Sequence, residues 1–218
     1  MDALARQADE VQVWQFSIRR VTLEAVAPFL DQEEARRASR YRRPEDQLRT
    51  ALGWAAARRV LGAALLRPPE ELRFSRRCRH CGHAEHGKPR LLDGGAIDFN
   101  LSHSGDFVLL AVASDRLVGV DVERIAGGPG PVEILRWLGP DAAAPEAPDE
   151  RSLLRRWTAA EARLKMTGRG LADLPLAPEP LPSCVTASLP LDTGHVAAAA
   201  ASPGPCQFRL IAGDHLFT

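Results

Sequence analysis

The sequence predicts an α+β protein whose two halves are alike. Val11–Ile18 alternates apolar and polar residues as a strand does, and a long Arg-rich helical stretch follows it. Strand-like runs return between Phe99 and Glu123, and a second strong helix is predicted at Arg151–Met166, before a closing pair of strand-like runs. This order indicates an α+β architecture with a seam between the halves near Val118.

Prolines and glycines divide the rest of the chain into shorter elements. Pro44 lies near the middle of the helical stretch Asp31–Leu65, so this stretch is predicted to form two helices, and Pro68 ends the second. The other expected elements are a short strand at 71–75, a loop at 76–95, a hairpin at 99–123, a turn at 127–131, a short helix at 131–138, a helix end at 167–170, and strands at 184–191 and 195–202.

Composition limits the class of protein. The 218 residues suffice for one large or two small domains, and 45% of them are apolar. Lys plus Arg and Asp plus Glu number 28 each, which argues against a general nucleic-acid binder but not against a local basic patch for phosphates. With no signal sequence and no membrane-spanning run visible, we expect a cytoplasmic protein whose four cysteines are reduced.

Two carboxylates interrupt an apolar strand-like run. Asp121 and Glu123 stand two residues apart, so on a strand they share one face, while Val120 and Val122 face the core. Two neighbouring anions repel each other, and a hard divalent cation between them would remove the repulsion. The alternative is an exposed sheet face on which each carboxylate is solvated or paired with an Arg.

The predicted helix at 151–166 brings a third carboxylate. Glu161 and Lys165 are four residues apart and share a helix face. The pair also fits an ordinary helix ion pair, and Thr158 with Glu161 fits a capping box at a helix start. From this stretch alone, a structural and a functional role both remain open.

Two polar stretches suit phosphate binding. Ser102 and His103 offer a hydroxyl and an imidazole where a strand begins, although a single His is commonly structural. Gly87 allows close approach of the backbone, and Lys88 adds a point charge before the turn-forming Pro89.

Four stretches together resemble the Sfp-type 4′-phosphopantetheinyl transferase family in order and spacing. They are GKP (Gly87–Pro89), FNLSHS (Phe99–Ser104), VGVDVE (Val118–Glu123) and WTAAEARLK (Trp157–Lys165). The upstream RYRRPEDQLRTALG and the C-terminal CVTASLPLDTGHVAAAAAS also look like that family, so the likeness covers most of the chain.

The resemblance implies a reaction and a fold. Such enzymes transfer the 4′-phosphopantetheine arm of coenzyme A to a serine of an apo acyl or peptidyl carrier protein, need Mg²⁺ and release adenosine 3′,5′-bisphosphate. The implied fold is a monomer with a pseudo-twofold pair of halves, here 1–117 and 118–218, and with coenzyme A in the cleft between them. Carriers of fatty-acid, polyketide or nonribosomal-peptide synthesis are all conceivable partners.

The resemblance also gives the site residues roles. It implies that Asp121, Glu123 and Glu161 hold Mg²⁺ with the coenzyme A pyrophosphate. Lys165 would stabilise or protonate the leaving phosphate. Either Glu161 or a metal-bound water would remove the proton of the carrier serine. The implied coenzyme A contacts are Arg37, Arg49, Thr50, Gly87, Lys88, Ser102, His103 and Lys165.

Two departures from the family pattern affect this interpretation. The helix motif usually has a Lys immediately before the Glu, and here that residue is Ala160. The segment 171–184 is short and Pro-rich where the family commonly has a longer hairpin, which leaves the carrier-binding surface open.

Trp157 is expected to pack in the core, and exposed apolar residues at Val132–Leu138 are a candidate docking surface for the carrier.

The loop at 76–95 contains a second possible metal site. Cys78 and Cys81 form a CxxC pair, with His80, His83 and His86 nearby, and two thiolates with two imidazoles suffice for structural Zn²⁺. A reduced, metal-free loop is the alternative, because there is no second CxxC. A zinc-stapled binding module, and a coenzyme A binder without turnover, are therefore alternatives to the transferase.

Overall fold

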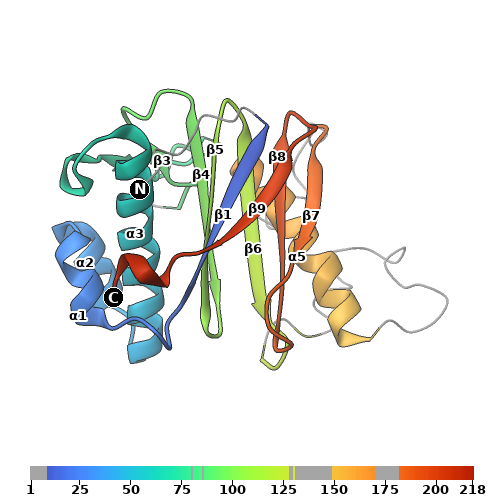
Figure 1. Ribbon diagram of the computed structural model, residues 1–218, viewed down its shortest axis with the longest axis horizontal. Coiled ribbons are helices and arrows are strands. Elements are labelled where there is room, and N and C mark those ends of the chain that lie inside the picture. The colour runs from blue at the N-terminus through green and yellow to red at the C-terminus, as the bar shows by residue number, and fades with distance from the viewer. Residues whose placement is uncertain (1–8, 80, 85, 128–129, 131–148, 170–181) are drawn as a thin grey trace.

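Two β-sheets pack face to face between two layers of helices (Figure 1). The computed structural model describes residues 9–79, 81–84, 86–127, 130, 149–169 and 182–218. In chain order the elements are β1 (Glu10–Ser17), α1 (Leu23–Val26), α2 (Gln32–Ser39), α3 (Pro44–Leu65), β2 (Phe74–Ser75), β3 (Arg90–Leu91), β4 (Ile97–Ser104), β5 (Phe107–Ser114), β6 (Leu117–Arg124), α5 (Glu150–Thr167), β7 (Val185–Leu189), β8 (His195–Ser202) and β9 (Gln207–Ala212), with short 3₁₀ turns at Ala27–Phe29, Pro69–Glu71 and Asp214–Leu216.

The two sheets differ in size and in strand direction. The larger has the strand order β4-β5-β1-β9, in which β9 runs parallel to β1 and the other pairs are antiparallel. The smaller has the order β6-β8-β7 and is antiparallel throughout its described part. Strands β2 and β3 form a separate two-stranded ribbon. Figure 1 shows α1, α2 and α3 on the outer face of the larger sheet and α5 on the outer face of the smaller one.

Residue alternation along the strands builds a core on each face of the larger sheet. In β5, Val108, Leu110 and Val112 pack toward the N-terminal helices. The intervening Leu109 and Ala111 pack toward the smaller sheet. Successive strand residues point to opposite faces, so one strand contributes to two cores.

The N-terminal helices are fixed by one buried cation. Asp31 and Glu34 form the capping box of α2. The same two carboxylates also bind Arg58 of α3, which is 1% exposed. Arg58 also donates to the carbonyl of Leu72, so it ties the cap of α2 and the chain after α3 to one point. Helix α3 begins at Pro44, which confirms the predicted break into two helices.

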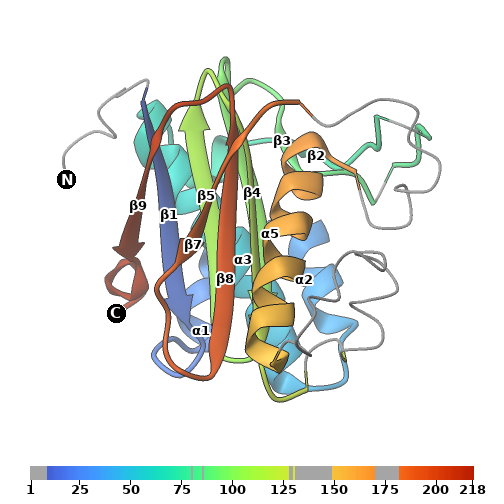
Figure 2. The same ribbon diagram turned by 90° about the vertical axis from the view of Figure 1, so that its right-hand side faces the viewer.

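Helix α5 lies along the smaller sheet beside β8 (Figure 2), and its backbone also contacts β6. A Cβ at Gly119 would lie 2.0 Å from the carbonyl oxygen of Ala162, so only glycine permits this approach. Trp157 is buried against Val196 of β8, which confirms its packing role. The helix is capped by Asp149, so Thr158 lies in its interior and the capping-box interpretation of Thr158 and Glu161 is wrong.

Side chains of β4 join the larger sheet to the edge of β6. Four alternate β4 residues accept hydrogen bonds from alternate backbone N–H groups of β6, each pair separated by 20 positions in sequence. The pairs are Asp98 with Val118, Asn100 with Val120, Ser102 with Val122, and Ser104 with Arg124. This ladder satisfies backbone donors that would otherwise be buried without a partner at a sheet edge.

Several predictions need correction or remain open. The stretch 99–123 forms three strands rather than a hairpin, because the chain leaves β5 and β6 pairs with β8. Strand β9 was not anticipated. The α+β class is confirmed, and the seam at Val118 falls at the start of β6. The pseudo-twofold relation of halves 1–117 and 118–218 stays a prediction.

Val132–Leu138 and most of 171–184 lie outside the described residues. No helix in the described part of the chain is long and apolar enough to span a membrane.

The ladder predicts the effect of removing one acceptor. Asn100→Ala would leave the Val120 N–H, 2.9 Å from Asn100 Oδ1, buried without a partner. The free energy of unfolding should fall by about 1–3 kcal/mol, measured by urea denaturation. As a control, Ser114→Ala removes a hydroxyl whose hydrogen-bond partner within the described residues is its exposed neighbour Asp115, and should change the free energy of unfolding by less than about 0.5 kcal/mol. Equal effects of the two variants would contradict this role of the ladder.

Candidate active site

A cleft of about 410 Å³ lies where the N-terminal helices, β4, β6 and α5 meet. Its floor comes from β4 and β6, and α3 and the loop before β3 provide side walls. The lining residues are Arg37, Tyr41, Thr50, Gly53, Trp54, Arg76, Pro89, Leu101, Ser102, His103, Val108, Asp121, Glu123 and Lys165. The cleft therefore joins basic, aromatic and acidic side chains from segments far apart in sequence.

Asp121 is the most buried charged group in the cleft. It is 2% exposed, and its Oδ1 accepts from the Lys165 ammonium at 2.6 Å and from the Ser102 hydroxyl at 2.9 Å. Its Oδ2 is buried and has no hydrogen-bond partner among the described residues. Such an orphaned carboxylate oxygen is costly unless a ligand uses it.

Glu123 and Glu161 both respond to the low polarity around them. Burial, and after it the nearby charge of Asp121, raise the pKa of Glu123 to about 7, against the opposing effect of the Ser104 hydroxyl 2.9 Å away. Burial likewise raises the pKa of Glu161, opposed by Lys165 and assisted by Asp121. Burial lowers the pKa of Lys165, but Asp121, Glu161 and Glu123 together raise it above its usual value. One ammonium thus faces three carboxylates.

This donor set fits a hard divalent cation. All three acidic groups offer oxygen ligands, Asp121 has a buried oxygen without a partner among the described residues, and the charge of Asp121 adds to burial in raising the pKa of Glu123. Among the described residues the three carboxylates do not form a group whose ligand atoms all lie within 4.8 Å of one another. Mg²⁺ commonly keeps water and phosphate ligands, so it does not require such an all-protein cage.

The other end of the cleft is basic and has an unused hydroxyl. Arg37 lines it with its side chain 21% exposed. The Oγ1 of Thr50 is buried and has no hydrogen-bond partner in the part of the chain that the structure describes. Burial, Lys165 and Arg49 together lower the pKa of His103. The positive charge of these nearby side chains favours the binding of an anionic ligand.

Three residues predicted to contact coenzyme A are engaged in the protein itself. The ammonium of Lys88 binds Asp98 and the carbonyls of Val118 and Met166, so it joins β4, β6 and α5. Gly87 packs against the backbone at 76–78. Arg49 donates to Asp46 and to the carbonyl of Gly105 and is not part of the cleft lining. Ligand contacts for these residues stay predictions.

The structure adds cleft residues that the motifs did not indicate. Tyr41, Trp54, Leu101 and Val108 provide an aromatic and apolar surface, and Arg76 adds a further cation. Trp54 lies ten residues after Pro44 in an Ala-rich helix, where it is indistinguishable in sequence from a core residue. Leu101 could have been found, because it stands two residues before His103 in the quoted strand motif and therefore lies on the same face of the strand.

The sequence is similar to known proteins of one family. Residues 12–115 match the family described as 4′-phosphopantetheinyl transferase, N-terminal. The chain is 31% identical over 185 residues to the 4′-phosphopantetheinyl transferase HetI of Nostoc sp., which covers 77% of this chain and 72% of HetI. It is 30% identical over 161 residues to psf-1 of Bacillus pumilus, covering 70% and 64%, and 31% identical over 157 residues to AcpT of Salmonella typhi, covering 69% and 77%. Both of these relatives are also named 4′-phosphopantetheinyl transferases.

The chain belongs to the 4′-phosphopantetheinyl transferase family and is an enzyme of that type. This confirms the resemblance drawn from the four motifs. It spans between 64% and 77% of the length of the three relatives compared.

The internal contacts of Lys88 predict that its removal harms folding. Lys88→Met would leave Asp98, whose side chain is 17% exposed, without its cation, and the free energy of unfolding should fall by about 3 kcal/mol in urea denaturation. Combining it with Asp98→Asn should restore part of this loss, since the unpaired charge is then absent.

The matched control is Arg67→Met, which removes a solvent-accessible ion pair of 3.9 Å to Glu71 and a 3.3 Å hydrogen bond to the Glu71 carbonyl. Its effect should stay below about 0.5 kcal/mol. A stability of Lys88→Met equal to that of the wild type would show that the buried contacts of Lys88 are unimportant.

Proposed function

We propose that this enzyme transfers the 4′-phosphopantetheine moiety of coenzyme A to a serine hydroxyl of an apo acyl or peptidyl carrier protein, with Mg²⁺, and releases adenosine 3′,5′-bisphosphate. The observation that supports this best is the cleft itself. It combines basic side chains, an aromatic and apolar wall, and acidic side chains that include a buried Asp121 oxygen with no partner in the described part of the chain. We place the activity in a cytoplasmic monomer.

The lining matches the parts of coenzyme A. Arg37, Arg76 and His103 supply positive charge for phosphate groups, and the 3′-phosphate is assigned to His103. Tyr41, which is 44% exposed, offers a flat surface for the adenine ring, and the buried Trp54 lines the same cleft while packing against Phe74. The buried Thr50 hydroxyl, which has no partner in the described residues, is available to the nucleotide. Gly87, Lys88, Arg49 and Ser102 remain proposed contacts through their nearby backbone or side-chain atoms.

The acidic end is the proposed metal site. Asp121, Glu123 and Glu161 would hold Mg²⁺ beside the pyrophosphate, where the ion neutralises the charge that develops on the phosphates. Lys165 is already 2.6 Å from Asp121 Oδ1, while Oδ2 is the oxygen left without a partner in the described structure. The protein can therefore offer a ligand atom to the ion without breaking the Lys165–Asp121 pair.

The residues around the metal site can divide the proton transfers between them. The carrier serine oxygen forms a bond to the β-phosphorus of coenzyme A, and the bond from that phosphorus to the bridging oxygen breaks. Glu161, whose pKa is raised by burial, or a water at the metal site would accept the serine proton. Lys165, held protonated beside Asp121, stabilises the leaving adenosine bisphosphate and can donate a proton to it.

Intact-mass spectrometry of an apo carrier protein tests the reaction. Incubation with the enzyme, coenzyme A and Mg²⁺ should add the mass of one phosphopantetheine, EDTA should prevent this, and excess Mg²⁺ should restore it. Carriers of fatty-acid, polyketide and nonribosomal-peptide type are tested in parallel. Coenzyme A binding in calorimetry without mass gain on any carrier would instead identify a binder that does not turn over.

Removal of the proposed ligands predicts loss of transfer. Asp121→Ala and Glu161→Ala should each lower kcat/KM at least about 100-fold in the mass assay and weaken coenzyme A binding measured with Mg²⁺. Glu150→Ala is the matched control, because this exposed Glu lies in the first turn of the same helix as Glu161. Full activity in either site variant would refute the metal assignment.

A further inference from the structure

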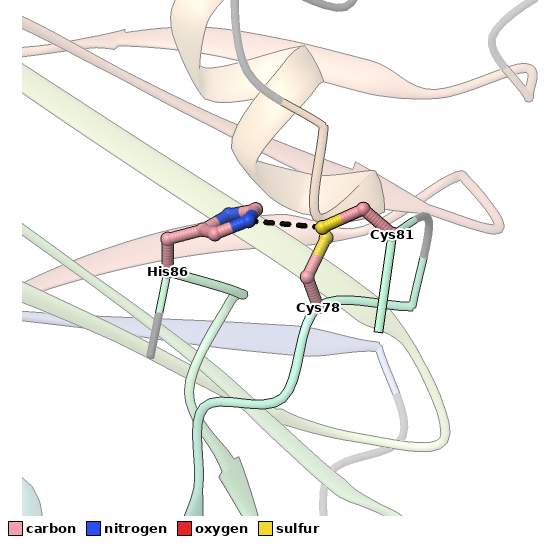
Figure 3. Close-up of side chains that lie close together, drawn as sticks. All are labelled: Cys78, Cys81 and His86. Atoms are coloured by element: carbon pink, nitrogen blue, oxygen red, sulfur yellow. Dashed lines mark hydrogen bonds between the residues drawn. The ribbon is translucent and has the colours of Figure 1, made fainter. Parts of the chain in front are cut away.

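The loop before β3 gathers two thiols and an imidazole away from the carboxylate site. The ligand atoms of Cys78, Cys81 and His86 all lie within 4.8 Å of one another. Figure 3 shows the three side chains pointing toward one another, with the Cys81 sulfur 3.0 Å from Nε2 of His86. Neither Cys is in a disulfide.

The backbone around the two Cys residues is folded into a tight turn. Gly82 donates to the carbonyl of Cys78 at 3.0 Å and has φ +75°, a conformation that favours glycine. The N–H of Cys78 in turn donates to the carbonyl of His83 at 2.8 Å. The turn therefore holds both sulfurs on one side before any ligand binds, which lowers the conformational entropy lost on binding.

We propose that Cys78, Cys81 and His86 bind one structural Zn²⁺. Two thiolates and an imidazole are the ligands that Zn²⁺ prefers, and hard cations such as Mg²⁺ avoid them. In a tetrahedral site a sulfur and a nitrogen lie roughly 3.5 Å apart, so the Cys81–His86 pair needs to open by only about half an ångström. His83 stacks on His86 with ring centroids 5.0 Å apart, but it is not one of the residues whose ligand atoms all lie within 4.8 Å of one another, so the fourth position is left to water or to a rearranged His83.

The zinc would stabilise one wall of the cleft. The N–H of Gly87 donates to the carbonyl of Arg76 at 2.7 Å, and a Cβ at Gly87 would lie 2.7 Å from Cα of Cys78. The chain entering the loop and the chain leaving it are thus in direct backbone contact. Arg76 and Pro89, on either side of this contact, line the cleft. Zn²⁺ binding would cross-link the loop next to this backbone contact and so hold Arg76 and Pro89 in position.

Metal analysis of the purified protein tests the site without any assay of transfer. Inductively coupled plasma mass spectrometry should find about one zinc per wild-type chain, retained after dialysis. Cys78→Ser and Cys81→Ser should each lower the zinc content at least tenfold. The matched controls are Cys184→Ser and Cys206→Ser, which change cysteines outside the loop and should keep the full zinc content.

Cobalt substitution separates loss of the site from loss of the fold. Wild-type protein reconstituted with Co²⁺ should show thiolate-to-cobalt charge-transfer bands and tetrahedral d–d bands, both absent in Cys81→Ser. His86→Cys should retain one zinc, whereas His86→Ala should lower the affinity at least tenfold. Wild-type protein that binds neither Zn²⁺ nor Co²⁺, or that has lost two hydrogens to a Cys78–Cys81 disulfide in its native state, would overturn the proposal.

The consequence for the cleft is measured on the same variants. Because Arg76 and Pro89 line the cleft, removal of zinc should raise the Kd for coenzyme A about three- to tenfold in calorimetry, and added Zn²⁺ should restore it in wild-type protein but not in Cys81→Ser. An unchanged Kd after complete removal of zinc would refute the stapling role. Metal content is measured without coenzyme A, so failure of the proposed transferase reaction would not affect that result.

Discussion

The unpaired edge of strand β6 is the constraint on which the site depends. A strand at the edge of a sheet exposes a row of N–H groups, and these need partners when another layer covers them. Here the partners are side chains of β4, from Asp98 to Ser104, rather than the backbone of another strand. The two sheets therefore remain separate at this junction, and residues of β4 and β6 line the cleft there.

The same junction sets the register of the acidic residues. Alternate N–H groups of β6 bind alternate β4 side chains, so a slip of one residue would remove all four hydrogen bonds. Ser102 shows how closely structure and chemistry are coupled. Its hydroxyl accepts from the Val122 N–H of the ladder, donates to Asp121 and accepts from Lys165. The group that aligns the two sheets also fixes the orientation of the buried carboxylate.

Helix α5 completes the site because its backbone lies directly on β6. Gly119 permits this contact, and Lys165, near the C-terminal end of α5, reaches Asp121 as a result. Lys88 contacts the same three elements, through Asp98 of β4 and the carbonyls of Val118 of β6 and Met166 of α5. Two lysines thus hold β4, β6 and α5 together. Lys88 does so in the interior, and Lys165 does so at the cleft, where its charge remains available for chemistry.

The sequence by itself determined the family and the α+β class, and it predicted the acidic residues of the proposed site. Strand alternation placed Asp121 and Glu123 on one face, and helical spacing placed Glu161 and Lys165 on another, because both patterns depend only on local geometry. The three-strand path of 99–123, the parallel pairing of β9, the interior position of Lys88 and the cleft position of Trp54 were decided by tertiary structure. Each depends on which distant segment satisfies a backbone edge or a buried charge, and local sequence patterns do not contain that information.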